Sequence, residues 1–324
     1  MTEFTARIAG IGSYLPERIL TNEEMSSMVD TSDSWIRERT GIRQRHIAPE
    51  GVTTADLAEQ AARRALDHAG LTGEDVDLIV VATTTPDFTF PSVGTMLQAR
   101  LGATKGAAFD VQAVCTGFVY ALSVADNMIA RGQAKTALVV GAETMSRILD
   151  WTDRTTCVLF GDGAGAMVLT GEEAGEGETS GILGTYLRSD GRFKDLLHVD
   201  GGPSSTGTVG QLRMIGNQVF RHAVTNIAES MTTIAGRAGI EIADIDWFVP
   251  HQANQRILEG VARKLSIPTE KVISTVADHG NTSAASVPLA FDRAVQDGRI
   301  KRGDLVLMEA LGGGFTWGAA LARY

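Results

Sequence analysis

Three side chains that can do chemistry stand in loops directly after strand-like segments. Cys115 lies between the strand-like run 109–114 and an apolar helix, His251 follows the run 247–249, and Asn281 lies in a glycine-containing turn before a second apolar helix. A cysteine thiolate is a nucleophile, and imidazole, carboxamide and backbone N–H groups can bind the charge that develops on the group it attacks. Three successive glycines, 312–314, form a turn that can supply such N–H groups. Together these residues predict nucleophilic catalysis with an oxyanion-binding loop.

The position of Cys115 favours a reactive thiol. From Thr116 the sequence predicts a helix that is apolar on nearly all sides and is therefore buried. The unpaired N–H groups at its N-terminus would stabilise an anion and lower the pKa of the thiol. A lone cysteine is more often a small buried hydrophobe, and this is our interpretation of Cys157, which lies in the strand-like run 157–160. His251 and Asn281 favour catalysis at Cys115.

The composition describes a folded, acidic chain. Of its 324 residues 44 % are hydrophobic and 21 % charged, and 29 Lys and Arg against 39 Asp and Glu give a net charge of −10. The apolar content excludes intrinsic disorder. General nucleic-acid binding is disfavoured because it requires a cationic surface. Any anionic partner would therefore need a local basic patch.

The sequence does not indicate secretion, a membrane span or a metal site. Two cysteines are too few for a disulfide framework, the start lacks the features of a signal peptide, and the longest apolar runs are of strand length. The six histidines and two cysteines show no metal-ligand spacing. The glycines in 161–165 lie between strands rather than in a dinucleotide-binding loop. We expect a cytoplasmic protein with no metal, no permanently bound cofactor, no membrane contact and no nucleic-acid partner.

Strands and helices alternate along the chain and must position these residues. The runs 76–82, 136–140, 247–249 and 305–308 are continuously apolar, which is typical of parallel strands covered by helices on both faces. Residues 54–70 predict a helix that ends at a glycine C-cap, and 157–169 predict two strands around a tight turn. The Gly- and Glu-rich segment 171–180 is the best boundary and divides the chain into halves 1–172 and 173–324.

The two halves resemble each other in sequence. Residues 69–83 align without a gap on 238–252, an offset of 169, and a second stretch aligns at an offset of 166, which pairs Cys115 with Asn281 and Gly132 with Gly298. Two matches in the same order predict one α/β unit duplicated about a pseudo-two-fold axis. On this alignment Cys115 and Asn281 occupy equivalent helix starts and face a shared centre.

Motifs spread over the whole chain carry a resemblance to a known family. They are GSYLP (12–16), TSDSWI (31–36), RTGIR (39–43), FP (90–91), CTGF (115–118), FGDGAG (160–165), PHQAN (250–254), GNTSAAS (280–286) and GGGFTWG (312–318). The sequence resembles the β-ketoacyl-acyl-carrier-protein synthase III family of thiolase-like condensing enzymes. The resemblance implies an αβαβα layered fold of two similar halves and the initiating condensation of type II fatty acid synthesis. The Cys/His/Asn set separates this branch from elongating synthases (Cys/His/His) and thiolases (Cys/His/Cys).

The resemblance implies a reaction in two stages. Cys115 attacks an acyl-CoA primer such as acetyl-CoA, while the N–H groups of Cys115 and Gly313 hold the oxyanion. Malonyl-acyl-carrier-protein then enters, and His251 and Asn281 bind its thioester carbonyl. Loss of CO₂ leaves an enolate that attacks the acyl group on Cys115. Phe90 corresponds to the family's apolar residue beside the malonyl carboxylate, and its bulk predicts a short primer.

The resemblance also implies a coenzyme A site. Trp35 and Arg154 would enclose the adenine, an arrangement compatible with cation–π contact. Arg39 would lie near a phosphate, and Thr31 and Asn254 would provide polar contacts.

A second implied site binds the carrier protein. Residues 254–265 predict an amphipathic helix. Its basic side chains Arg256, Arg263 and Lys264, with Arg221 near by in the family fold, form the expected docking surface for an acidic acyl carrier protein. The family is usually a homodimer, which we expect here too.

Three alternatives remain open from the sequence. Val114 and Thr116 flank the nucleophile where the family more often has smaller residues, so a specialised starter synthase or acyltransferase of polyketide or quinolone type is the runner-up. Cys/His/Asn is also the set of papain-type hydrolases, although no local papain signature surrounds Cys115. A non-catalytic protein of the same fold is disfavoured because all three site residues are present.

Overall fold

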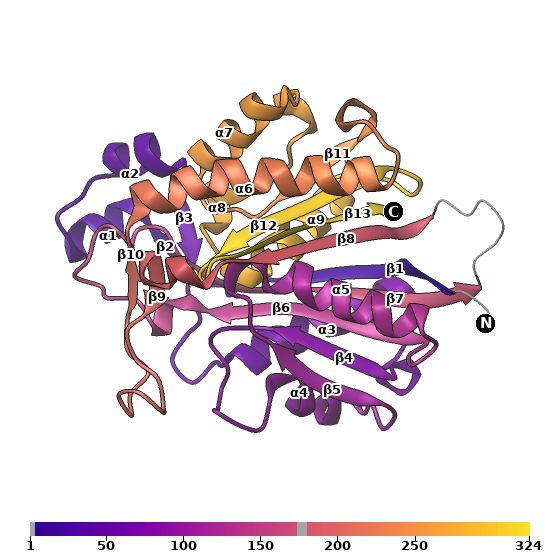
Figure 1. Ribbon diagram of the computed structural model, residues 1–324. Coiled ribbons are helices and arrows are strands. Elements are labelled where there is room, and N and C mark those ends of the chain that lie inside the picture. The colour runs from indigo at the N-terminus through magenta and orange to yellow at the C-terminus, as the bar shows by residue number, and fades with distance from the viewer. Residues whose placement is uncertain (1–3, 174–179) are drawn as a thin grey trace.

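Continuous runs of aliphatic residues form the central strands of two sheets in the computed structural model, which describes residues 4–173 and 180–324 (Figure 1). The first sheet has the order β1-β7-β6-β4-β5 and the second the order β11-β12-β13-β8. The predicted buried parallel strands are found: β4 pairs with β6, and β11 with β12, both in parallel. β4 and β6 are buried at every residue because helices cover both faces of their sheet.

The strands have the following bounds. The first sheet contains β1 (Phe4–Tyr14), β4 (Leu78–Ala82), β5 (Ala107–Val111), β6 (Thr136–Thr144) and β7 (Asp162–Glu173). The second contains β8 (Gly181–Ser189), β11 (Trp247–Pro250), β12 (Leu305–Gly312) and β13 (Thr316–Arg323). Two small antiparallel pairs are β2 (Ile19–Thr21) with β3 (Gln44–His46), and β9 (Leu197–Val199) with β10 (Leu212–Met214).

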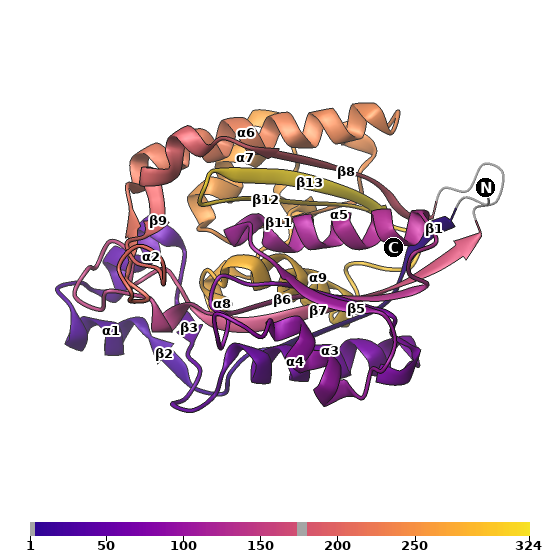
Figure 2. The same ribbon diagram turned by 60° about the horizontal axis from the view of Figure 1, so that its bottom comes forward.

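The helices form three layers that alternate with the sheets (Figures 1 and 2). Their bounds are α1 (Asn22–Met28), α2 (Asp33–Thr40), α3 (Thr54–Ala69), α4 (Val93–Leu101), α5 (Gly117–Ala130), α6 (Gly216–Arg237), α7 (Gln255–Leu265), α8 (Val276–His279) and α9 (Ser286–Gln296). Short 3₁₀ turns are η1 (Gly73–Asp75), η2 (Val114–Thr116), η3 (Met145–Arg147), η4 (Gly191–Leu196), η5 (Ile242–Asp244), η6 (Thr269–Lys271) and η7 (Ser283–Ala285). α3 and α4 cover the outer face of the first sheet, α5 and α9 lie between the sheets, and α6 covers the second sheet with α7 beside it. This is the predicted αβαβα arrangement.

The bounds of the elements correct the internal alignment. η1 and η5, η2 and η7, the starts of α5 and α9, and the starts of β6 and β12 are each 169 residues apart. The offset of 166 holds at the C-terminal ends of α5 and α9, where Gly132 and Gly298 follow with positive φ. α9 is shorter than α5 by one turn, so the pairing of Cys115 with Asn281 as equivalent helix starts is wrong: the equivalent of Cys115 is Ala284.

The predicted helix at 54–70 is confirmed, whereas the strand predicted at 157–160 is not found. α3 ends before Gly70, which has a φ of 68° and caps the helix as predicted. The run 157–160 is not a strand, because the Cys157 N–H bonds back to the Asp153 carbonyl and the Leu159 N–H to that of Thr156, so the backbone turns. The Cys157 side chain is fully buried, as predicted for a core residue.

The division of the chain into 1–172 and 173–324 stays a prediction. Its boundary segment, 171–180, falls largely on residues 174–179, which lie outside the described residues. Within the described ranges, no helix combines the length and the apolar character needed to cross a bilayer.

Candidate active site

Cys115 lies in η2, directly before α5, and its side chain is 3 % exposed. The preceding residue, Val114, has a φ of 50°, a region that β-branched residues rarely adopt. The turn between β12 and β13 lies against this segment: a Cβ on Gly312 would stand 2.6 Å from the Cys115 backbone nitrogen, so only glycine fits. The structure thus brings the predicted nucleophile next to the predicted oxyanion loop, in which Gly313 follows.

Burial raises the pKa of the Cys115 thiol to about 12, which reverses the lowering expected from the sequence. Desolvation is the largest cause; a hydrogen bond with Ser283 acts in the opposite direction, and the negative charge of Glu143 raises the pKa further. Cys115 precedes the first turn of α5 in a closed interior, so loss of hydration outweighs the helix N-terminus. The thiol is therefore protonated in the unliganded chain.

His251 follows β11, and one hydrogen bond fixes its backbone while another fixes its ring. Its N–H donates to the Glu309 carbonyl on β12 at 2.7 Å, and its Nδ1 is hydrogen-bonded to Ser286 Oγ at 2.6 Å. Burial lowers the pKa of His251 to about 3, so the imidazole is neutral. Ser286 Oγ also accepts the Gln252 N–H at 3.4 Å. When the Ser286 hydroxyl donates to Nδ1, the proton of the neutral ring lies on Nε2.

Asn281 is fixed by the strand-like contact of its backbone with the chain before β7. Its N–H donates to the Leu159 carbonyl at 2.9 Å, and its carbonyl accepts the Gly161 N–H at 3.0 Å. Asn281 Oδ1 accepts the Ser283 N–H at 2.9 Å. The carboxamide oxygen is therefore occupied, and Nδ2 is left to donate to a ligand.

The segment 281–286 gathers the three predicted residues at one place. It contains Asn281 itself, Ser283, whose turn η7 packs against the turn η2 that carries Cys115, and Ser286, which bonds His251. The sequence reasoning missed the two serines and also Glu143, whose carboxylate accepts the Ser283 hydroxyl at 3.0 Å. The spacing of the serines within GNTSAAS was the available signal, whereas Glu143, inside an apolar strand, had none beyond its charge.

Trp35 lies beside Arg39 and Arg154, the two arginines predicted to bind coenzyme A with it. Trp35 lies on α2, with Arg39 Cζ 4.5 Å and Arg154 Cζ 5.3 Å from its ring centroid. Arg154 also donates to the Asp30 carbonyl at 2.7 Å. Both guanidinium groups are at direct cation–π distance, so an adenine between Trp35 and Arg154 must displace the Arg154 guanidinium. Thr31, which follows Asp30 in the sequence, has a buried Oγ1 without a hydrogen-bond partner.

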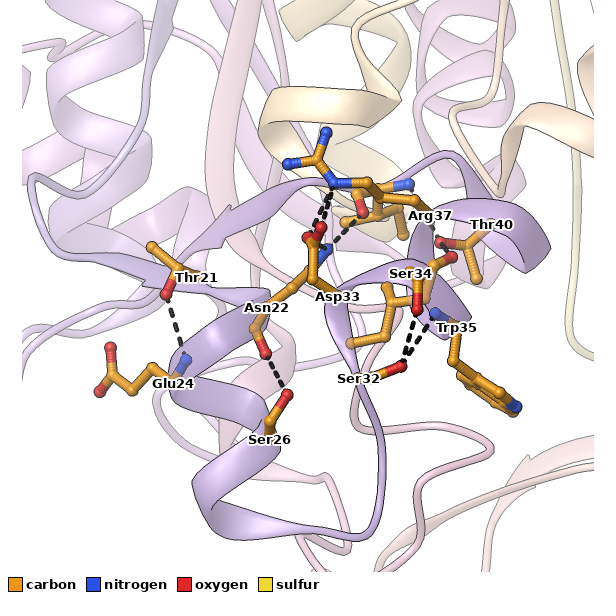
Figure 3. A network of polar contacts seen from close by, with 12 residues as sticks. Thr21, Asn22, Glu24, Ser26, Ser32, Asp33, Ser34, Trp35, Arg37 and Thr40 are labelled. Atoms are coloured by element: carbon orange, nitrogen blue, oxygen red, sulfur yellow. Dashed lines mark hydrogen bonds and ion pairs between the residues drawn. The ribbon is translucent and has the colours of Figure 1, made fainter.

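The polar network in Figure 3 orients the helix that carries Trp35. Ser32 Oγ accepts the Trp35 N–H at 3.1 Å and caps α2. Asn22 Nδ2 donates to Asp33 Oδ1 at 2.9 Å and to the Ile42 carbonyl at 2.8 Å, and Asp33 also pairs with Arg37 at 2.7 Å. Both ends of α2 are thereby fastened, so the indole of Trp35 is presented by a rigid helix.

The predicted carrier-protein residues lie on α6 and α7, next to α2. α7 is amphipathic as predicted, and Asn254 is its N-cap, with Oδ1 accepting the Ile257 N–H at 3.0 Å. Arg256, Arg263 and Lys264 are all exposed. Arg256 donates to the Glu38 carbonyl on α2 at 3.0 Å, and Arg263 is 3.5 Å from Glu259.

Arg221 is also exposed and lines an open cavity of about 430 Å³ on α6. Because α7 packs against both α6 and α2, the predicted carrier surface and the predicted coenzyme clamp adjoin.

Phe90 is not part of this cluster. It lies in the loop between β4 and α4 with 84 % of its side chain exposed, and Phe88 near by is 58 % exposed. An apolar wall that excludes water cannot itself be in water, so Phe90 does not form such a wall within this single chain, and its role beside the malonyl carboxylate stays a prediction. Residues 88–91 are exposed, and burial of Phe90 requires contact with another molecule.

No group of three or more His, Cys, Asp or Glu side chains with the geometry of a metal site occurs in residues 4–173 and 180–324.

A buried cysteine before a central helix, with a neutral histidine and an asparagine from the second half of a duplicated αβαβα fold, defines a thiolase-like condensing enzyme. Comparisons with known proteins narrow this class. Residues 109–191 match the family described as 3-oxoacyl-[acyl-carrier-protein] synthase III, and residues 236–324 match its C-terminal family. The chain belongs to the β-ketoacyl-acyl-carrier-protein synthase III family and is an acyltransferase of the condensing type.

Curated relatives and solved structures agree over nearly the whole length. The chain is 65 % identical over 318 residues to the β-ketoacyl-[acyl-carrier-protein] synthase III of Rhodospirillum centenum, and 62 % identical over 317 residues to that of Caulobacter vibrioides; each match covers 98 % of both chains. It is similar to the crystal structure of the 3-oxoacyl-[acyl-carrier-protein] synthase III from Aquifex aeolicus, with a TM-score of 0.93, 47 % identity and coverage of 98 % of this chain and 100 % of that one. This membership excludes the hydrolase and the non-catalytic alternatives.

Proposed function

We propose that Cys115 is the nucleophile and that His251 and Asn281 are the hydrogen-bond donors of an initiating condensation of an acyl-CoA primer with malonyl-acyl-carrier-protein. The observation that supports these roles most directly is the segment 281–286, which contains Asn281 and contacts both Cys115 and His251. In the first stage the Cys115 sulfur attacks the primer thioester and coenzyme A leaves. The adjoining turn at Gly312 and Gly313 supplies a backbone N–H to the oxyanion, together with that of Cys115.

In the second stage the two donors act on the malonyl thioester. The Nε2–H of a neutral His251 and the Nδ2–H of Asn281 are both available, because Ser286 and the Ser283 N–H occupy the other polar atoms of these side chains. Two donors on the thioester carbonyl stabilise the enolate formed as CO₂ leaves. The enolate carbon attacks the acyl group on Cys115, and the products are 3-oxoacyl-acyl-carrier-protein and the free enzyme. Neither step calls for a permanently bound cofactor.

We further propose the partners. Trp35, Arg39 and Arg154, with Thr31 and Asn254, bind the adenine and phosphates of coenzyme A. The exposed Arg221, Arg256, Arg263 and Lys264 bind the acidic carrier protein, and the enzyme works in the cytoplasm.

We also propose a homodimer, supported by the exposed Phe88 and Phe90, which form an apolar surface that a second copy can cover. Any control of primer length by Phe90 then depends on that second copy. We expect acetyl-CoA or propionyl-CoA as primer, and turnover of dodecanoyl-CoA at a comparable rate would contradict this.

One assay tests the assigned roles. The protein is incubated with [¹⁴C]acetyl-CoA and malonyl-acyl-carrier-protein, and labelled acetoacetyl-carrier-protein is measured for the wild type, Cys115→Ser and Asn281→Ala. We expect no covalent label and no product in Cys115→Ser. Asn281→Ala should still be labelled on Cys115 but lose condensation. Product formation by Cys115→Ser would refute the nucleophile assignment.

The specialised starter synthase remains the second candidate. A priming β-ketosynthase from the R1128 polyketide pathway has a TM-score of 0.93 to this chain at 36 % identity, so the fold is shared by both kinds of enzyme. The higher identity to synthase III relatives favours the fatty acid role. Comparing turnover with a fatty acid carrier protein and a polyketide carrier protein decides between them.

A further inference from the structure

The carboxamide of Asn281 is oriented by the residue two positions further along the chain. Asn281 Oδ1 accepts the backbone N–H of Ser283 at 2.9 Å, and both side chains are buried. A carboxamide has an acceptor oxygen on one branch and a donor nitrogen on the other, so this hydrogen bond sets the direction of both. The proposed condensation needs Nδ2 as a donor, and the backbone of Ser283 therefore determines whether Asn281 can supply it.

The backbone of Ser283 has an uncommon conformation that needs support. Its φ of 50° lies in the left-handed region, which serine rarely adopts. Such a conformation has an energetic cost and persists where the surrounding structure holds it. The hydrogen bond to Asn281 lies within the same turn, so it cannot hold this turn against the rest of the molecule. The side chain of Ser283 makes a contact that can.

The Ser283 hydroxyl is bonded to Glu143, near the C-terminal end of β6 in the first half of the chain. Ser283 Oγ donates to Glu143 Oε1 at 3.0 Å, and both side chains are fully buried. β6 and η7 approach closely here, because a Cβ on Gly141 would stand 2.3 Å from the Ala284 carbonyl oxygen. The hydrogen bond therefore crosses from the first half to the second at a point where the two backbones meet.

Three consecutive threonines after β4 hold the Glu143 carboxylate in place. Its oxygens accept the Thr85 hydroxyl at 2.6 Å, the Thr84 N–H and hydroxyl at 3.0 to 3.1 Å, and the Thr83 hydroxyl at 3.3 Å. The Thr85 hydroxyl oxygen itself accepts the Thr144 N–H at 2.9 Å, which leaves its hydrogen for Glu143. Movement of the carboxylate would leave these buried donors unpaired, which is costly. Glu143 is thus a fixed acceptor for Ser283.

We propose that Glu143 is a positioning residue for condensation, which acts through the Ser283 hydroxyl to hold the Asn281 carboxamide with Nδ2 free to donate to the malonyl thioester. The proposal rests on the proposed role of Asn281 as a hydrogen-bond donor. In this role neither Glu143 nor the Ser283 hydroxyl contacts the substrate or transfers a proton. The first half of the chain then supplies the proposed nucleophile and also supports a donor that belongs to the second half.

Loss of this support should slow condensation more than primer loading. Primer loading uses the Cys115 sulfur and backbone N–H groups, whereas condensation also uses Asn281. A misdirected carboxamide removes a donor from the enolate, and a displacement of about 1 Å at a reacting group can cost about 100-fold in rate. We therefore expect the loss in kcat for condensation, with KM for malonyl-acyl-carrier-protein changed less than about threefold.

The test measures acetylation of Cys115 by mass spectrometry and then single-turnover condensation of the acetyl-enzyme with malonyl-acyl-carrier-protein. Condensation is expressed per acetyl-enzyme, so misfolded protein is not counted. Ser283→Ala should condense about 10- to 100-fold more slowly than the wild type and acetylate within about threefold of it. Ser123→Ala, which removes a buried hydroxyl that is hydrogen-bonded to Thr185 at 2.7 Å, is the matched control and should be normal in both stages.

A double-mutant cycle shows whether Ser283 acts through Asn281. The variant that combines Ser283→Ala with Asn281→Ala should condense within about threefold of Asn281→Ala alone, because the group that Ser283 positions is already absent. Losses that multiply in the double variant would overturn the proposal. Ser283→Gly adopts a positive φ without steric cost and lacks the hydroxyl, so it should show the same loss and the same cycle if the alanine variant does not fold.

Two variants of Glu143 separate its contact from its charge. Glu143→Gln keeps the length of the side chain, and its amide can donate to Ser283 Oγ while its oxygen accepts the Thr84 N–H. Glu143→Asp keeps the charge but is shorter by one methylene group. We expect condensation within about threefold of the wild type for the glutamine variant and about a 10- to 100-fold loss for the aspartate variant.

The outcomes distinguish this proposal from the proposed function. Equal losses in Glu143→Gln and Glu143→Asp would show that the charge matters rather than the contact, which contradicts the positioning role. Condensation by Ser283→Ala at the wild-type rate, with Asn281→Ala slow, would refute the positioning role alone. Condensation by Asn281→Ala at the wild-type rate would instead refute the proposed role of Asn281.

Discussion

Ser286 and His251 illustrate how one hydrogen bond sets the chemistry of a side chain. A buried neutral imidazole can donate from either nitrogen, and the bond at Nδ1 decides which. Ser286 Oγ lies 2.6 Å from Nδ1, and when its hydroxyl donates to Nδ1, the ring proton lies on Nε2. The reactive atom of His251 is thus chosen by a residue on a different element, at the first position of α9.

Substitution of Ser286 by alanine should therefore reduce condensation more than primer loading. Without the hydroxyl, the ring can place its proton on Nδ1, and the enolate loses a donor. We expect about a tenfold to hundredfold loss of kcat for condensation, with the rate of Cys115 acetylation within about threefold of wild type. Single-turnover measurements of the two stages check this, and equal losses in both stages would show that Ser286 only supports the fold.

Glu309 is a second buried acid, and it affects stability rather than the proposed chemistry. It lies beneath α7 with Oε2 unpartnered, among apolar residues such as Phe248 and Val261. Burial raises its pKa from 4.5 to about 8. The unfolded chain therefore loses this proton at lower pH than the folded chain, and the free energy of unfolding falls as pH rises from about 4.5 to about 8.

Glu309→Gln should flatten this pH dependence. At pH 7 we expect the free energy of unfolding of the variant to be higher by about 1–3 kcal/mol. The upper end follows from about 1.4 kcal/mol per unit of pKa shift. The gain is smaller than that because the glutamine amide also lacks hydrogen-bond partners. Urea unfolding at pH 5 and pH 7.5 measures the free energy of unfolding of the wild type and the variant. The difference between the two proteins should be larger at pH 7.5. A constant difference would mean that Glu309 is ionised in the fold.

At the scale of elements, two segments contribute to the proposed function through different properties: the turn between β12 and β13, and the helix α7. The turn is shaped by what cannot fit: glycine at 312 lets two backbone segments meet beside the nucleophile. The helix buries Ile257, Leu258 and Val261 and leaves its basic residues in water. We therefore expect the turn to be disrupted by one added methyl group and the binding by α7 to change with its charge.

Gly312→Ala should disable primer loading. The added Cβ would stand 2.6 Å from the Cys115 nitrogen, so the turn or η2 must move and the oxyanion donors separate. We expect acetylation to fall at least about 100-fold. Gly236→Ala, on α6 with nothing within 4 Å of its Cβ, is the control and should load primer like the wild type. Normal loading by Gly312→Ala would remove this turn from the site.

Reversing the charge of Lys264 should weaken binding of the carrier protein without changing primer loading. Lys264→Glu places a like charge opposite an acidic partner, for which we expect a threefold to tenfold higher KM for malonyl-acyl-carrier-protein, an effect of about 1 kcal/mol that shrinks with salt. Lys301→Glu, exposed before β12 and far along the chain from α7, is the matched control. If both variants raise KM equally, net charge rather than α7 is responsible.

At the scale of the whole molecule, duplication explains where the site lies. Cys115 comes from the first half and His251 and Asn281 from the second, and the central helices α5 and α9 lie between the two sheets. The equivalent 3₁₀ turns η2 and η7 meet at this seam, with Cys115 in one and Ser283 in the other. Divergence of two similar halves has thus placed the proposed nucleophile in one of them and the proposed hydrogen-bond donors in the other.

The exposed phenylalanines predict self-association. Phe88→Ser combined with Phe90→Ser should shift sedimentation from dimer toward monomer, because a covered aromatic pair contributes several kcal/mol per copy by apolar burial, about 1.5–3 kcal/mol for each side chain. Met28→Ser, at another exposed apolar side chain, is the control. A double variant that remains dimeric would place the interface elsewhere.

The sequence alone predicted which residues carry the chemistry and determined which elements hold them. Cys115, His251 and Asn281, the glycine turn, the buried parallel strands and the helix α7 all follow from local patterns: apolar periodicity, caps and short motifs. These depend on neighbours in the chain, and so they can be predicted from it.

Only the tertiary structure decided how those residues behave. The raised pKa of Cys115, the outward position of Phe90, the true equivalence of Cys115 with Ala284, and the partners Ser283, Ser286 and Glu143 all depend on packing between distant segments; the Ser283–Glu143 bond joins residues 140 positions apart. Burial and hydration are properties of the assembled interior. The sequence predicted the position of the thiol, and the fold determined that it is buried, which raises its pKa.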